Sequence, residues 1–400
     1  MDRAELARRL GHEPAFAEPR EVELAEGDPA RFMAAFGEAV AAGGRVFLAD
    51  PGWGARERAQ LAALRALAPP ADAGGWLAIP TGGSSGNLKL ARHDEGTLGA
   101  AVRGFSAAFG PGPVNAVGLL PLHHVSGLMA WLRCVLTGGT YVPWEARRLL
   151  TGDRPPLGAG AWFISLVPTQ LARLLAEPAA VAWLRGFRAV FVGGGPAWPE
   201  LRAAGRAAGL PLSFTYGMTE TAAMVTALMP EAFLAGAEGS GRPLPHAHVT
   251  LDPEGRIVVA GESLFRGYYP DGRRETAWAT EDLGRWDEQG SLHVLGRRDG
   301  FIITGGEKVD PLEVETVLRS TGAFADVAVI GVADAQWGER VVACYPANTG
   351  TPDLSRVMPA LEGALAAFKR PKAFVAVKDW PRNAQGKLNR AALREAAASA

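Results

Sequence analysis

The sequence predicts an α/β protein with a large layered N-terminal domain and a small α+β C-terminal domain. Short apolar runs at residues 45–50, 161–167 and 189–192 are typical of buried strands. Segments with Leu and Ala at helical spacing, such as residues 55–68 and 171–185, separate such runs. This alternation favours layered architecture, and a length of 400 residues favours more than one domain.

The pattern changes between residues 248 and 303 to short strands separated by turn signals such as Asp252-Pro253-Glu254-Gly255. We therefore expect a β-rich distal part of the large domain. The C-terminal module would alternate helix, strand, strand and helix at residues 311–319, 327–332, 340–345 and 354–369.

Charge and composition point to small-molecule chemistry. The chain carries 41 basic and 42 acidic residues, so there is no electrostatic case for a nucleic-acid partner. The most apolar stretch, residues 116–136, is interrupted by two histidines and an arginine, and we expect no membrane span. The chain starts without a secretory signal pattern, and Cys134 and Cys344 suit neither a disulfide framework nor a thiolate metal site. These features predict a cytoplasmic protein.

A Gly/Ser-rich segment follows the apolar run at residues 76–80. Its glycines let backbone N–H groups converge on phosphate oxygens, and its hydroxyls and lysine add donors and charge. Taken alone, the segment could equally be a surface turn, because the P-loop spacing is absent. The candidate phosphate-binding residues are Thr81, Gly82, Gly83, Ser84, Ser85, Gly86 and Lys89.

The same residues also spell G-x-S-x-G, the nucleophile elbow of α/β-hydrolases, with Ser84 as nucleophile. A hydrolase would need an acid and then a histidine downstream. The last histidine is His293, which leaves an awkwardly long segment after the presumed triad. We therefore keep the hydrolase as a remote alternative.

A second glycine cluster, Gly193-Gly194-Gly195, follows the strand at residues 189–192. A dinucleotide fingerprint starting at Gly193 would need its third glycine at the position of Trp198. The cluster therefore fits a turn that lines a pocket.

Residues 215–221 combine an aromatic ring, a glycine, hydroxyls and one carboxylate. This set suits stacking on a base, contact with a phosphate and binding of Mg²⁺. In isolation it could equally be a strand end with a helix cap. Near the C-terminus, the pair Gly386-Lys387 indicates a function only when it is considered together with the other clusters.

In combination, these clusters resemble the signatures of the adenylate-forming acyl-CoA synthetase superfamily. Residues 81–89 resemble its phosphate loop, although Gly82 and Leu88 stand where the superfamily has Ser and Pro. Glu281 likewise replaces a Gly in its TGD motif. The remaining matches follow in order: residues 216–220 for YGxTE, residues 280–282 for TGD, residues 296–299 for GRxD, residues 305–307 for the next loop and residues 386–387 for the terminal GK.

The resemblance implies an AMP-forming acid–thiol ligase with ATP, Mg²⁺ and coenzyme A as cofactor and co-substrates. It implies that residues 81–86 and Lys89 hold the β- and γ-phosphates, that Thr219 contacts the α-phosphate, and that Glu220 holds Mg²⁺. Tyr216 would stack on adenine beside Gly194, Gly217 and Met218, Asp282 and Arg297 would bind the ribose, and Lys387 would bridge the carboxylate and the α-phosphate.

It also implies the adenylate-forming enzyme fold, with an adenylation domain at residues 1–298 and a mobile domain at residues 299–400. Asp299 would be the hinge about which the second domain turns. Gly305 and Gly306 would then replace Lys387 at the site for the thiol step.

The acyl pocket is most similar to that of the o-succinylbenzoate–CoA ligases of menaquinone and phylloquinone biosynthesis. Residues 121–128, 192–197 and 216–222 carry this similarity. It places His124 beside the acyl carboxylate, although a histidine at a helix start could have a purely structural role. A ligase of other specificity, a carrier-protein-loading adenylation domain, a non-catalytic binder and a homodimer all stay open. The other implied substrate contacts are Ser126, Gly193, Gly194, Gly195, Met218 and Thr221.

Substitution of Lys387 by Ala tests the implied two-step mechanism. Because this cation is needed when two anions approach, Lys387→Ala should slow adenylation by about 10²- to 10³-fold. Thioester formation from a supplied acyl-adenylate should survive. Pyrophosphate release and thioester formation, measured separately, check this; equal losses in both would contradict it.

Overall fold

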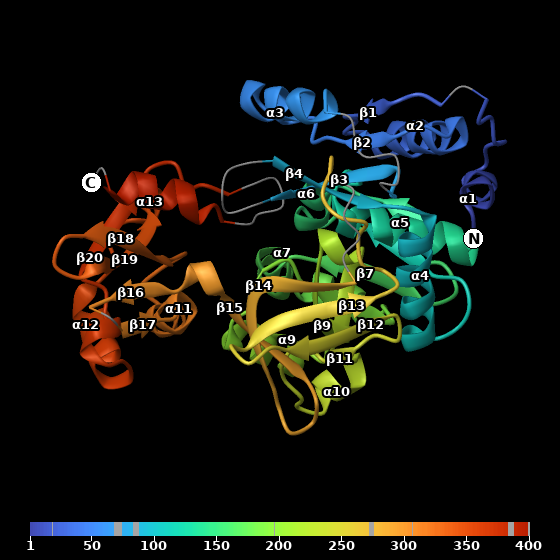
Figure 1. Ribbon diagram of the computed structural model, residues 1–400. Helices are drawn as coiled ribbons and strands as arrows, with labels where there is room; N and C mark the ends of the chain where they lie inside the picture. Colours follow the sequence, from blue (N-terminus) through green and yellow to red (C-terminus); the bar gives the residue numbers. More distant parts are fainter. Residues whose placement is uncertain are drawn as a thin grey trace. The chain divides into compact units, whose positions relative to one another are not determined.

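The computed structural model describes residues 1–17, 19–67, 74–82, 88–195, 197–271, 276–305, 307–382 and 388–398 (Figure 1). Contacts divide the chain into unit 1, Met1–Thr280 with Arg285–Val294, and unit 2, Glu281–Gly284 with Leu295–Ala400. The predicted α/β class, with a large first and a small second part, is confirmed. The hinge position at residue 299 stays a prediction.

The centre of unit 1 is a seven-stranded sheet in the order β11-β10-β9-β8-β7-β5-β6. Strands β6, β5, β7, β8 and β9 are parallel, whereas β10 and β11 are antiparallel additions. Strands β5 and β8 are buried along their whole length, as expected for parallel strands covered on both faces. The strands are β5 (Asn115–Gly118), β6 (Tyr141–Pro143), β7 (Trp162–Leu166), β8 (Ala189–Val192), β9 (Leu212–Met218), β10 (Ala223–Ala227) and β11 (Arg242–Pro243).

The helices of this layer mostly follow the predicted spacing, with one correction. The segment at residues 171–185 is two helices, because Pro178 cannot continue the first one and instead opens the second. The helices of this part are α4 (Glu95–Phe109), α5 (Val125–Thr137), α6 (Ala146–Leu150), α7 (Pro168–Leu175), α8 (Pro178–Leu184), α9 (Pro199–Ala207) and α10 (Pro230–Leu234).

A second sheet in unit 1 has the order β1-β2-β3-β4, with β4 antiparallel to β3 and the others parallel. Its core includes Phe32 and Phe36, whose rings stack with centroids 6.0 Å apart, and Trp131 from α5. The elements are α1 (Arg3–Arg9), β1 (Val22–Leu24), α2 (Pro29–Ala42), β2 (Val46–Leu48), α3 (Ala55–Arg65), β3 (Leu77–Gly82) and β4 (Leu88–His93).

The predicted β-rich distal part is confirmed as a third sheet, β12-β13-β14-β15. The turn between its first two strands uses the signal noted in the sequence: Asp252 Oδ1 accepts hydrogen bonds from the backbone N–H groups of Glu254 and Arg256. Its strands are β12 (Ala247–Leu251), β13 (Arg256–Gly261), β14 (Ala277–Trp286) and β15 (Leu292–Arg297).

Unit 2 is an α+β module whose sheet has the order β17-β16-β19-β18, with β20 parallel to β19. Four of its elements, α11, β18, β19 and α12, confirm the predicted helix, strand, strand and helix. The elements are β16 (Ile302–Thr304), β17 (Glu307–Val309), α11 (Pro311–Ser320), β18 (Ala328–Asp334), β19 (Gly338–Pro346), α12 (Leu354–Ala364), β20 (Ala373–Val377) and α13 (Arg390–Ala398).

A buried carboxylate ties the last helix to the core of unit 2. Glu315 on α11 is only 2% exposed. Its Oε1 accepts hydrogen bonds from the backbone N–H of Val329, at 2.8 Å, and from Nη2 of Arg390, at 2.6 Å. Arg390 is the first residue of α13, so this pair anchors the last described helix of the chain.

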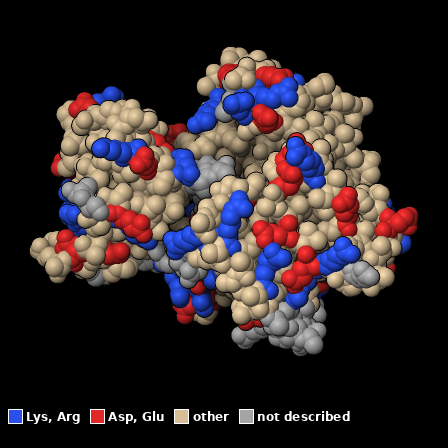
Figure 2. Space-filling view, turned by 90° about the horizontal axis from the view of Figure 1, so that it is seen from above, with Lys and Arg blue, Asp and Glu red and all other residues tan. Residues whose placement is uncertain are grey.

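None of the described helices has the length and apolar character needed to cross a bilayer. Figure 2 shows basic and acidic side chains interspersed on the face in view, as the near-zero net charge leads us to expect.

Substitution of Glu315 by Gln should lower the free energy of unfolding of unit 2 by about 1–3 kcal/mol, because Arg390 loses its buried counter-charge. The matched control is Glu313→Gln on the same helix, which removes an exposed pair with Lys369 and should cost at most about 1 kcal/mol. Denaturant melts of both variants measure the difference. Equal losses of unfolding free energy in the two variants would show that the buried pair stabilises unit 2 no more than the exposed pair does.

Candidate active site

The implied phosphate loop connects two antiparallel strands. Thr81 on β3 lies opposite Lys89 on β4, and Gly82 lies opposite Leu88. This register holds the hydroxyl-bearing and cationic ends of the loop close to each other. The loop residues Gly83, Ser84, Ser85 and Gly86 lie outside the described part of the chain.

A short chain of contacts links Lys89 to Glu220. The Lys89 ammonium lies 5.2 Å from the centre of the Tyr268 ring, and the Tyr268 hydroxyl donates a 2.5 Å hydrogen bond to Glu220 Oε1. Glu220 is 6% exposed. A carboxylate has more lone pairs than this bond uses, so a buried acid beside the phosphate hairpin can also hold a hard cation such as Mg²⁺.

His93 on β4 positions the neighbouring turn, and the sequence analysis missed it. Its Nε2 lies 2.8 Å from the carbonyl oxygen of Thr219, and its Nδ1 lies 3.0 Å from the Thr97 hydroxyl. Burial lowers the pKa of His93 to about 4, so the ring is neutral. A carbonyl can only accept, so we assign the proton to Nε2. The signal available in the sequence was a histidine four residues after Lys89, at the end of the same strand.

The turn after β9 depends on two residues with little freedom. A Cβ atom on Gly217 would lie 2.1 Å from the carbonyl oxygen of Ala223, so only glycine fits. Thr221 is fully buried, and its hydroxyl bonds the backbones of Met218 and Ala223. Its side chain therefore stabilises the turn, and we do not include it among the proposed acyl contacts.

Three predicted clusters follow the carboxyl ends of parallel strands in one sheet. His124 and Ser126 come after β5, the three glycines Gly193–Gly195 come after β8, and residues 219–221 come after β9. The carboxyl ends of parallel strands meet at the same edge of a sheet, where open α/β sheets bind ligands. Tyr216 lies near the end of β9, almost buried, with its hydroxyl 3.5 Å from that of Thr280.

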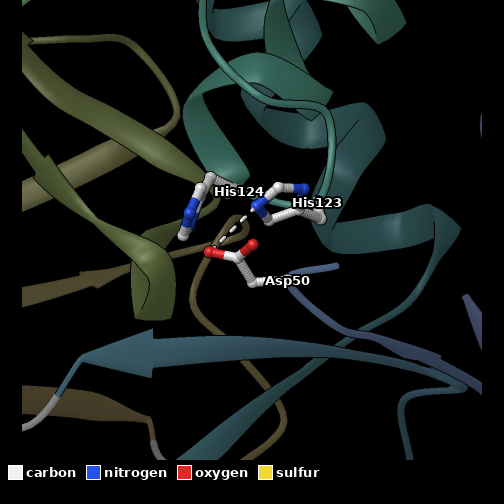
Figure 3. A group of neighbouring side chains, drawn as sticks. All are labelled: Asp50, His123 and His124. Atoms are coloured by element: carbon white, nitrogen blue, oxygen red, sulfur yellow. Dashed lines mark ion pairs between the residues drawn. The ribbon is translucent and has the colours of Figure 1, made fainter. Parts of the chain in front are cut away.

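His124 lies in a cluster with His123 and Asp50 (Figure 3). His124 is the N-cap residue of α5, and its ring centre lies 4.5 Å from that of His123. His123 Nε2 lies 3.5 Å from Asp50 Oδ2. Burial, reinforced by the adjacent His123, lowers the pKa of His124 to about 4, and burial also lowers the pKa of His123. Both rings are therefore neutral at pH 7.

Arg133 on α5 is a buried cation near the amino end of β5, away from the edge that the predicted clusters follow. It is 4% exposed and its guanidinium lies 4.4 Å from the centre of the Phe105 ring. Its Nε and Nη2 have no hydrogen-bond partner within the described residues, and burial lowers the pKa of Arg133 to about 10. A buried cation with free donors is costly unless an anion pairs with it.

The implied ribose and thiol-step residues belong to unit 2. Asp282 lies on β14 and Arg297 on the neighbouring β15. Gly305 adopts φ +59°, and its backbone N–H donates to the carbonyl oxygen of Trp337 at 2.8 Å. Gly306, Lys387 and the side chain of Asp299 lie outside the described residues. A bridge between Arg382 and Leu388 brings together the two ends of the segment that contains Lys387.

The family is established by comparison with known proteins. Residues 76–269 match the family described as AMP-binding enzyme, and residues 313–387 match the AMP-binding enzyme C-terminal domain. The chain is 34% identical over 336 residues to a Mycobacterium tuberculosis protein, with 83% of that protein covered. It therefore belongs to the family of adenylate-forming AMP-binding enzymes, as the sequence motifs predicted.

The match to the Mycobacterium tuberculosis relative covers 79% of this chain, and that relative is named probable 2-succinylbenzoate–CoA ligase. The 2-succinylbenzoate–CoA ligase of Geobacillus sp. (strain WCH70) is 32% identical over 292 residues, which are 69% of this chain but 59% of the relative. The match to that relative thus spans less than two thirds of its length.

A solved structure of o-succinylbenzoate CoA synthetase from Bacillus subtilis, in complex with its acyl-adenylate intermediate, has the same fold. The TM-score is 0.79 at 24% identity, over 98% of this chain and 91% of that one. The same enzyme with ATP and magnesium ion has a TM-score of 0.78 at 23% identity, over 98% and 92% of the two chains. The predicted adenylate-forming fold is confirmed.

The neutral, buried His93 should make stability depend on pH. Below pH 6.5 the unfolded chain takes up a proton that the folded chain excludes until about pH 4. Stability should therefore decrease as the pH is lowered, by about 1.2 kcal/mol per pH unit from this residue between about pH 6 and pH 5.

Denaturant melts of His93→Gln across that range should show a shallower slope by this amount. The control His248→Gln replaces an exposed histidine and should leave the slope unchanged. A His93→Gln slope equal to that of the unsubstituted protein would contradict the neutral assignment.

Proposed function

We propose that this chain activates a carboxylic acid with ATP, through an acyl-adenylate, and transfers the acyl group to coenzyme A. We propose 2-succinylbenzoate as the acid. Membership of the AMP-binding family and the names of the relatives support the reaction. The observation that carries the choice of acid is the name of the relatives: the Mycobacterium tuberculosis protein, 34% identical with 83% of its length covered, is named probable 2-succinylbenzoate–CoA ligase.

In the first step a carboxylate must attack the α-phosphate of ATP, so two anions have to approach each other. Preorganised cations and N–H donors lower this barrier because they are aimed at the charge that develops. Lys89 and the backbone of the hairpin around it would hold the outer phosphates, and Thr219, positioned by His93, would contact the α-phosphate. Lys387 of unit 2 would bridge the two reacting groups.

Glu220 fits a magnesium-binding role, because it is a buried carboxylate two contacts from Lys89. Bound Mg²⁺ supplies charge neutralisation for the departing pyrophosphate. The Tyr268 hydroxyl would keep the Glu220 side chain in one orientation. Tyr216 would support the adenine, and Asp282 and Arg297 would bind the ribose hydroxyls.

For the second step we propose that unit 2 turns about Asp299. Lys387 would then leave the site, and Gly305 and Gly306 would face the thiol of coenzyme A. Glycine at these positions leaves room for an extended ligand close to the backbone, and the positive φ of Gly305 requires it.

The acid would lie against the carboxyl edge of the central sheet. A flat ring could approach the backbone of Gly193–Gly195, with Met218, His124 and Ser126 around it. The neutral His124 can donate a hydrogen bond to the reacting carboxylate without neutralising its charge.

The second carboxylate of 2-succinylbenzoate needs a strong donor, because a buried unpaired carboxylate costs several kcal/mol. Acids that lack the second carboxylate would leave that donor unsatisfied. A site of this kind can reject such analogues by about 10⁴-fold.

Thioester formation with free coenzyme A tests the proposal, with 2-succinylbenzoate compared with benzoate, 4-coumarate and a medium-chain fatty acid. We expect 2-succinylbenzoate to have the highest kcat/KM. A higher value for any of the other acids would overturn the choice of acid. Adenylation without acylation of free coenzyme A would instead favour a carrier protein as the acceptor.

A further inference from the structure

Asp50, His123 and His124 form a cluster that the proposed reaction does not fully use. Asp50 comes shortly after β2, and the two histidines come directly before α5 (Figure 3). One ligand atom from each of the three side chains lies within 4.8 Å of the others. The proposed reaction assigns a role only to His124, so it leaves the close approach of Asp50 and His123 unexplained.

The contact between Asp50 and His123 is too long for a good hydrogen bond. The separation of His123 Nε2 and Asp50 Oδ2 is 3.5 Å, and this nitrogen is buried without a hydrogen-bond partner in a side chain 6% exposed. Two ligands on a tetrahedral zinc ion, each about 2.0–2.1 Å from the metal, are separated by about 3.3–3.5 Å. The spacing of this pair is therefore that of two ligands on one ion, and the third ligand atom lies within 4.8 Å of both.

The orientation of Asp50 is held by the chain itself. Its Oδ1 accepts a 2.8 Å hydrogen bond from the backbone N–H of Gly52, which turns Oδ2 toward His123. Such a bond to a ligating carboxylate limits its rotation and lowers the entropy lost on binding. The cluster is therefore partly organised before an ion arrives.

The donor set selects the class of ion. Two imidazole nitrogens and one carboxylate oxygen suit zinc and its neighbours in the first transition series, whereas Mg²⁺ and Ca²⁺ prefer oxygen ligands alone. Imidazoles bind metals in the neutral form, which is the common form of histidine at pH 7. The cluster would thus not compete for the magnesium ion that we assign to Glu220.

We propose that Asp50, His123 and His124 bind one divalent ion of the zinc class. Three protein ligands leave a fourth tetrahedral position for water or an anionic ligand, as in zinc sites that remain open. The site does not depend on the proposed ligase activity, because it is defined by these three side chains alone.

Binding is measured on the full chain without an affinity tag, after chelator treatment, in the absence of ATP, acid and coenzyme A. Calorimetric titration with Zn²⁺ should give one equivalent per chain. Asp50→Asn, His123→Gln and His124→Gln should each weaken binding by more than about 100-fold. Loss of a ligand should lower the affinity more than loss of a group that only hydrogen-bonds to a ligand. The matched control His248→Gln, an exposed histidine on β12, should bind as the unsubstituted chain does.

Titration with Co²⁺ gives a second readout. We expect visible d–d bands that are lost in each ligand variant, with no thiolate charge-transfer band. A thiolate band would place the ion on Cys134 or Cys344 and overturn the proposal. So would the absence of saturable binding, or binding that persists in all three variants. Circular dichroism melts establish which variants fold. If Asp50→Asn and His123→Gln fail to fold, the test rests on His124→Gln, whose position is partly exposed.

Discussion

The candidate site depends on the parallel register of β5, β7, β8 and β9. Because these strands run in one direction, the segments that follow β5, β8 and β9 all emerge at one edge of the sheet. That constraint brings His124, the glycine turn and the Thr219–Thr221 turn to the same side although the chain separates them widely. The other elements of unit 1 add side-chain contacts to this edge of the sheet.

The second sheet is joined to this edge by hydrogen bonds of side chains. His93 on β4 bonds the carbonyl oxygen of Thr219, and Tyr268, which bridges to Ala91 on the same strand, bonds Glu220. Lys89 lies on that strand too. The strand that carries the phosphate-loop lysine therefore also positions the turn with the implied magnesium ligand, so a shift of β4 would move both groups together.

Desolvation shapes the chemistry of unit 1. Burial keeps His93 and His124 uncharged, so these rings serve as hydrogen-bond donors, acceptors or metal ligands and not as cations. Burial also lowers the pKa of Arg133, to about 10, but this group stays charged at pH 7. The same desolvation therefore leaves the two histidines neutral and the arginine charged.

The sequence by itself determined the α/β class, the β-rich distal part, the helix-strand-strand-helix order of the C-terminal module and the motifs of the AMP-binding family. These features depend on local spacing: apolar periodicity, glycine turns and hydroxyl-rich loops act over a few residues. It did not reveal that Pro178 divides one helix into two. Tertiary structure alone decided the partners of His93, the burial of the Thr221 hydroxyl, the unpaired state of Arg133 and the approach of Asp50 to His123. Each of these features depends on segments far apart in the sequence that pack around a polar group and exclude water from it. A local sequence pattern does not specify which distant segments do so.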